Sequence, residues 1–175
     1  MKKLLLSLIL VASTGSIAIA QDLSQLITDL AKIEGVQHQL VDKAMLDKQL
    51  EDAKAADPTG ELASKIPAFM QKIDQIEVVV AQSAPTEIKD KITSQLADFR
   101  DENGYESLLK VKQGEQDIRI IAKKGKEKSD IFVIVMADEA IIAVKMTGDL
   151  NEQDFIDIVK EQQKNQQQQQ PEEQE

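Results

Sequence analysis

Residues 105–150 read YESLLKVKQG EQDIRIIAKK GKEKSDIFVI VMADEAIIAV KMTGDL, in which short polar turns separate four apolar runs. The runs cover residues 107–112, 117–123, 130–137 and 140–146. Runs of this length are typical of β-strands, and such short connections join antiparallel neighbours. The segment therefore predicts a four-stranded antiparallel meander. The stretch 131–136 is apolar at every position, so we expect it to be a central strand.

The rest of the chain alternates between helical and extended patterns. Helices are predicted over residues 23–33, 42–53, 61–72 and 84–103 and from Asn151 to residue 160, and strands over residues 36–41 and 76–81. This order predicts an α+β domain. Its antiparallel β-sheet would combine the four-strand C-terminal meander with one or two N-terminal strands, and its helices would pack mainly on one face.

The N-terminus has the three parts of a secretory signal peptide. Lys2 and Lys3 precede the apolar run 4–12, and Ala18-Ile19-Ala20 supplies the small residues of a cleavage site. An uncleaved membrane anchor is the alternative, but residues 4–20 are barely long enough to span a bilayer. We expect cleavage after Ala20, no transmembrane segment afterwards, and a periplasmic or secreted protein.

The predicted organisation is therefore simple. Residues 1–20 form the signal peptide, residues 21–160 a single α+β domain, and residues 161–175 a disordered, Gln-rich acidic tail. The chain contains no cysteine, so disulfides and acylation through a lipobox cysteine are excluded.

Composition also limits the classes of function. The formal net charge of −10 repels phosphate backbones, so we expect no nucleic-acid partner. His38 is the only histidine, and no spacing around it is typical of a catalytic or metal site. The sequence therefore predicts no catalytic residue, no metal site and no cofactor.

Basic side chains gather in two places within the meander. They are most often solubilising residues at hairpins and strand edges. The alternative is a positive interaction patch for an anionic partner or lipid headgroup. The candidate residues are Lys110, Lys112, Arg119, Lys123, Lys124, Lys126 and Lys128.

Four segments in this order resemble a family of exported proteins from Gram-negative, gut-type bacteria, named domain of unknown function 4252. They are KIEGV at 32–36, IDQIEV at 73–78, YESLLKV at 105–111 and MTGDL at 146–150. The family more often has glycine where this chain has Gln75, and many members are lipoproteins with a lipobox cysteine. The resemblance implies export, and it transfers no activity and no site residue.

Together these features favour an exported, non-enzymatic accessory or interaction protein of the bacterial cell envelope, with an envelope protein as its partner. Two alternatives remain open. A small-molecule or lipid-binding carrier would need an apolar cavity between the sheet and the helices. An envelope hydrolase that depends on carboxylates would need two acids facing each other in a concave pocket.

Overall fold

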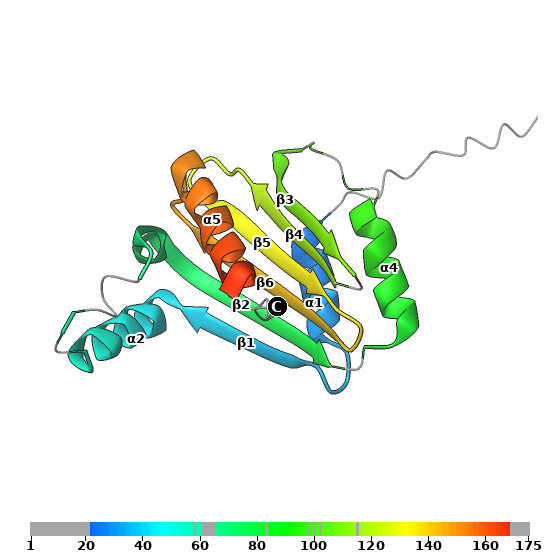
Figure 1. Cartoon of the computed structure of the whole chain (residues 1–175), viewed down its shortest axis with the longest axis horizontal. Coiled ribbons are helices and arrows are strands. Elements are labelled where there is room, and N and C mark those ends of the chain that lie inside the picture. Colours follow the sequence, from blue (N-terminus) through cyan, green and yellow to red (C-terminus); the bar gives the residue numbers. More distant parts are fainter. Residues whose placement is uncertain are drawn as a thin grey trace, which may run out of the picture.

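A computed structural model shows a six-stranded antiparallel sheet in the order β1-β2-β6-β5-β4-β3 (Figure 1). The structure describes residues 22–57, 59–60, 66–82, 84–97, 99, 101, 103–114 and 116–168. The strands are β1 (Gln37–Asp42), β2 (Ile73–Gln82), β3 (Tyr105–Gln113), β4 (Gln116–Lys123), β5 (Ser129–Met136) and β6 (Ala140–Gly148). The predicted meander is confirmed as β3 to β6. Both N-terminal strands extend it on the β6 side, where β2 pairs with β6 and β1 with β2.

Helices lie on both faces of this sheet, whereas the sequence suggested mainly one. They are α1 (Leu23–Ala31), α2 (Lys43–Ala55), the 3₁₀ helix η1 (Ala68–Lys72), α4 (Thr86–Ala97) and α5 (Glu152–Gln168). In Figure 1, α1 lies behind the sheet and α5 in front of it. Side chains of α1 and α4 belong to one core cluster, and those of α2, η1 and α5 to another. The α+β class is confirmed.

Two-sided covering follows from the strands themselves. On β5, Phe132 and Ile134 belong to the cluster under α1 and α4, whereas Ile131 belongs to the cluster under α5. The register continues each face across the sheet, so that Val144 of β6 pairs with Val133 on one side and with Val78 on the other. A strand that is apolar on both faces must be covered on both to remove that surface from water.

Local signals set most helix starts correctly. Asp42 accepts a hydrogen bond from the Met45 N–H at 2.9 Å and so caps α2, at the residue where the sequence predicts this helix to begin. At the other end of the chain, α5 extends to Gln168 and includes residues 161–168, which the sequence placed in the tail. Glutamine has good helix propensity, so it continues a helix whose first turns are already packed. The predicted signal peptide at 1–20 and the segment 169–175 lie outside the described residues.

Among the described residues, no helix combines the length and the apolar character needed to span a membrane.

Candidate functional site

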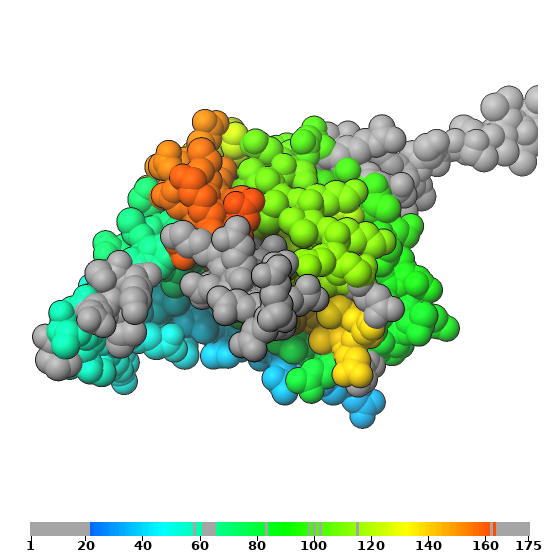
Figure 2. Space-filling view, viewed as in Figure 1, coloured from blue at the N-terminus to red at the C-terminus, as the bar shows by residue number. Residues whose placement is uncertain are grey.

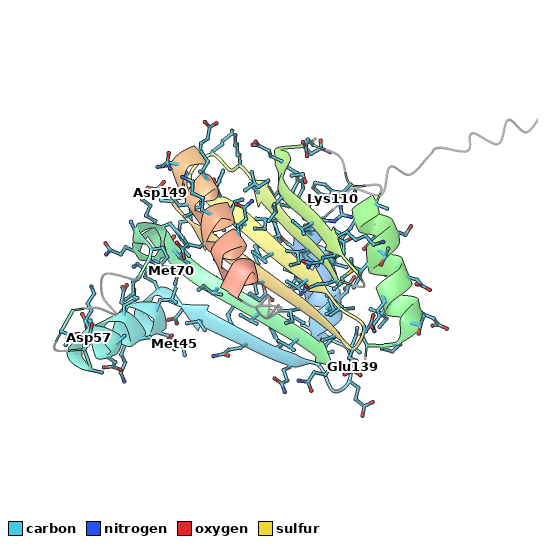
Figure 3. All side chains as sticks on the ribbon, viewed as in Figure 1. Met45, Asp57, Met70, Lys110, Glu139 and Asp149 are labelled. Atoms are coloured by element: carbon cyan, nitrogen blue, oxygen red, sulfur yellow. The ribbon has the colours of Figure 1, made fainter. Side chains whose placement is uncertain are left out.

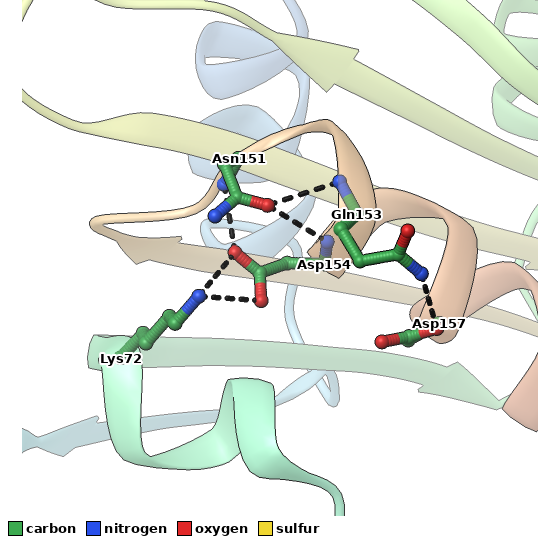
Figure 4. A network of polar contacts seen from close by, with 5 residues as sticks. All are labelled: Lys72, Asn151, Gln153, Asp154 and Asp157. Atoms are coloured by element: carbon green, nitrogen blue, oxygen red, sulfur yellow. Dashed lines mark hydrogen bonds and ion pairs between the residues drawn. The ribbon is translucent and has the colours of Figure 1, made fainter.

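The junction between β6 and α5 fixes the position of α5 on the sheet (Figure 4). Gly148 ends β6 where the chain passes very close to η1: a Cβ on this glycine would lie 2.2 Å from the carbonyl oxygen of Lys72. The next residue, Asp149, donates its N–H to the same oxygen at 3.1 Å. The close approach therefore requires glycine at position 148.

The first turn of α5 then forms a reciprocal cap. The Oδ1 atom of Asn151 accepts the N–H groups of Gln153 and Asp154, at 2.9 and 3.2 Å. Oδ2 of Asp154 in turn accepts the Asn151 N–H at 2.8 Å. This is a capping box in which aspartate takes the place of the usual glutamate. Figure 4 also shows the Lys72 ammonium on both carboxylate oxygens of Asp154, so that the cap is tied to the end of η1.

Fixed in this way, α5 leaves a groove between itself and the edge strand β3. Figure 2 shows the orange and red surface of α5 next to the yellow-green surface of β3. The groove has a volume of about 370 Å³. Its lining is mainly apolar, with charged side chains among it: Leu108, Phe155, Ile156 and Val159 with Glu106, Glu152 and Lys160.

One lysine joins the two glutamates of the groove. The Lys124 Nζ atom lies 2.9 Å from Oε2 of Glu106 and 3.1 Å from Oε1 of Glu152. Hydrogen bonds with Glu106 and then Glu152 raise the pKa of Lys124 above its usual value of 10.5. The ammonium is therefore charged at neutral pH, and it links the start of β3 to the first turn of α5.

Two carboxylates in a concave site are also what a glycoside hydrolase would need. Its general acid must keep its proton near neutral pH, which calls for burial in apolar surroundings. Here the Glu106 side chain is 47 % exposed and that of Glu152 84 % exposed, and both contact the same ammonium. This arrangement suits a charged rim of a binding groove better than an acid–base pair.

The structure separates the predicted basic residues into two groups. Lys110 and Lys112 are exposed on β3, and Figure 3 shows Lys110 near that edge of the sheet. Lys124, Lys126 and Lys128 are exposed in the connection from β4 to β5. The two groups lie toward opposite ends of β4, because Lys110 pairs with Arg119 and Tyr105 with Lys123. They do not form one continuous patch.

Several of these charges already have acidic partners. Besides Lys124, the Lys128 Nζ atom lies 3.0 Å from Oδ2 of Asp74. Lys123 instead lies over the Tyr105 ring, 4.8 Å from its centre, and its interaction with Tyr105 is the main cause of its raised pKa. Local pairing of this kind reduces the positive potential available to an anionic partner.

Arg119 is buried and so is not part of the surface. Its Nε and Nη2 atoms contact the two carboxylate oxygens of Asp117 at 2.7 and 3.0 Å, and Nη1 donates to the Leu96 carbonyl at 3.2 Å. Arg119 thereby joins β4 to the last turn of α4, where cationic groups are favourable. The sequence placed Arg119 among the candidates for a positive surface patch, but β4 is buried on both faces.

His38, the single histidine, lies on β1 far along the sheet from the groove. Its Nε2 atom is 3.0 Å from Oε1 of Glu77 on the neighbouring strand. Within the described part of the chain, His, Asp and Glu side chains form no group of three placed to hold a metal ion.

Comparison with known proteins identifies the family. The profile of a domain of unknown function, DUF4252, matches residues 32–158. The chain belongs to the DUF4252 family. No curated protein and no solved structure matches it. The DUF4252 match contains all of β1 to β6 and the first turns of α5, so Glu106, Leu108, Glu152 and Phe155 of the groove lie inside it.

The structure also explains one segment that carried the resemblance to DUF4252. MTGDL at 146–150 contains Gly148, which allows the close contact with Lys72, and Leu150, which is buried under α5. The groove itself was not foreseen from the sequence. The one signal for it is Ile156, an apolar residue beside the buried stripe of Phe155 and Ile158, and 48 % exposed.

Proposed function

We propose that this DUF4252 protein is an exported, non-enzymatic accessory protein of the bacterial cell envelope, and that it binds a polypeptide partner in the groove between α5 and β3. The observation that carries the proposal is the lining of the groove: an open, mainly apolar trough between α5 and β3 is edged by charged side chains. Exposed apolar surface with a polar rim is typical of protein-binding sites.

The lining supports a polypeptide more than an enclosed small molecule. Ile156 and Glu152 are both well exposed, so the groove is open to solvent along α5. A carrier site buries most of its ligand's surface, and this needs walls on all sides. Leu108, Phe155 and Val159 instead offer an apolar floor for aliphatic side chains, and Lys160 and the two glutamates bound to Lys124 place charges at its rim.

Site-specific photocrosslinking in the native envelope tests the groove. A photoreactive amino acid at Ile156 is expected to capture one specific protein, because this side chain lines the groove and faces solvent. The same amino acid at Met45 of α2 is the control, since Met45 is equally apolar and 46 % exposed but lies far from the groove (Figure 3). Equal capture at both positions, or capture of a lipid alone at Ile156, would refute the polypeptide partner.

Export has its own test, which is independent of the groove. The full chain, expressed in a Gram-negative host, is expected to reach the envelope with Gln21 as its first residue, because the cleavage pattern ends at Ala20. Mass spectrometry of the purified protein measures the new N-terminus. An intact Met1 on a cytoplasmic product would contradict export.

A further inference from the structure

The two edges of the sheet differ in how they are protected. On β3, a register shift between Ser107 and Leu109 interrupts the strand, and Asp101 accepts the Ser107 N–H at 2.8 Å. Lys110 and Lys112 follow, both exposed. Bulges, occupied backbone groups and lysines are the usual protections of an edge strand against addition of another strand.

β1 shows none of these features. It pairs with β2 residue by residue from Gln37 to Asp42 without a register shift, and residues 37–42 contain no lysine, arginine or proline. Side chains 37–40 are all exposed, including Leu40 at 51 %. In the described part of the chain, β2 is the one strand beside β1, so the outer backbone groups of β1 have no strand partner.

Charge indicates which strand can pair there. A second copy of an acidic chain with net charge −10 is repelled from most of this protein's surface. Along β1, however, residues 37–41 carry no carboxylate. Of the acids nearby, Glu77 contacts the His38 imidazole and Asp42 accepts the Met45 N–H, whereas Glu34 is exposed three residues before the strand. Paired segments 37–41 of two copies therefore place no carboxylate of one directly opposite a carboxylate of the other.

We propose that β1 pairs antiparallel with β1 of a second copy, so that two sheets join into one across a twofold axis. Such an axis must be perpendicular to the sheet, and paired residues must therefore share a face. Because Asp42 already begins α2, the free edge runs from Gln37 to Val41 and has Gln39 at its centre. In this register Gln39 faces its own counterpart, and Leu40 packs opposite His38 of the other copy.

The chain has no cysteine, so single cysteines report this register directly. Gln39→Cys places two thiols in directly paired positions, within the Cα separation that a disulfide allows. Gln37→Cys is the matched control, because it replaces the same exposed residue type on the same face. In the proposed register residue 37 lies opposite residue 41 of the other copy, so the two thiols introduced at position 37 are four residues apart along the strands. Mild oxidation is expected to crosslink the Gln39→Cys protein into dimers and to leave the Gln37→Cys protein uncrosslinked.

Sedimentation of the full-length protein, purified from the envelope after export, measures the dimer without modification. The wild type is expected to dimerise at micromolar concentration, and Leu40→Lys to weaken the dimer by about tenfold or more, because it places lysine on the edge. Leu40 is exposed, so this substitution leaves the core unchanged. Met45→Lys is the control and is expected to dimerise like the wild type. A monomer at high micromolar concentration, a dimer that Leu40→Lys does not weaken, or equal crosslinking at positions 37 and 39 would each overturn the proposal.

Discussion

The Nζ atom of Lys72 lies 2.8 Å from Oδ1 and 2.9 Å from Oδ2 of Asp154. This ion pair joins the last residue of η1 to the first turn of α5, although the two residues are far apart in the chain. The Asp154 side chain is nearly buried, whereas that of Lys72 is 40 % exposed. Asp154 is therefore the more important partner for the position of α5. It also caps this helix, and so it determines where the groove lies.

Substitution of Asp154 should destabilise the whole domain. Asp154→Ala removes the cap acceptor and the ion pair together, and we expect a loss of about 2–3 kcal/mol in the free energy of unfolding. Asp154→Asn keeps an acceptor for the Asn151 N–H and should lose about half as much. Urea denaturation measures both. Asp157→Asn, an exposed change in the same helix, should stay within about 0.5 kcal/mol of the wild type; a similar loss there would show that the contact with Lys72 has no special role.

Gly148 should tolerate no side chain. We expect Gly148→Ala to cost about 2–4 kcal/mol, because its Cβ would lie 2.2 Å from a backbone oxygen that cannot move independently. Gly35→Ala is the comparison. Gly35 has a φ of +82°, but a Cβ there would meet no atom within 4 Å, so strain alone should cost about 1 kcal/mol. Thermal unfolding of both variants gives the ranking, and equal costs would contradict the steric explanation.

Arg119 should behave as a core residue and not as a surface charge. Arg119→Lys loses the two-point contact with Asp117, and we expect it to cost about 2 kcal/mol even though the charge is kept. Its cross-strand neighbour Lys110 is exposed, so Lys110→Ala should change stability by less than about 0.5 kcal/mol. Chemical denaturation compares the two, and the reverse order would contradict the burial of Arg119.

The contacts of Lys124 predict a shift that titration can measure. Glu106 and Glu152 raise its pKa, so any stability that it contributes is fully present below about pH 10.5 and is lost as the pH rises through the higher pKa of the folded state. In NMR titrations of the lysine side chains, Glu152→Gln should move the pKa of Lys124 back toward 10.5. High salt should also move the pKa of Lys124 toward 10.5, because salt screens the charges of these exposed side chains. An unchanged pKa in Glu152→Gln would exclude the contact in solution.

The sequence predicted the meander well because each strand carries its own signal. The apolar run 131–136 indicated a central strand, and β5 does lie inside the sheet. The caps at Asp42 and Asn151 were also recognisable, since both act within three residues of their own position. Local patterns of this kind need no knowledge of the tertiary fold.

What could not be predicted depends on contacts between distant segments. Arg119 looked like a solvated residue because its partners at the end of α4 become neighbours only in the folded sheet. The groove likewise combines Leu108 of β3 with Phe155 and Val159 of α5. Neither segment alone shows that the two lie side by side. The basic residues suggested an interaction site at turns where most charges already have partners.

The pairing of β2 with β6 has a consequence for the order of folding. It joins Ile73 to Gly148, so the two N-terminal strands gain their place in the sheet only when the chain is complete almost to α5. Closing so long a loop is slow, since its entropy is lost before the new contacts form. A nascent chain therefore lacks its complete sheet until β6 has been made, and the export proposed above needs a chain that has not yet folded.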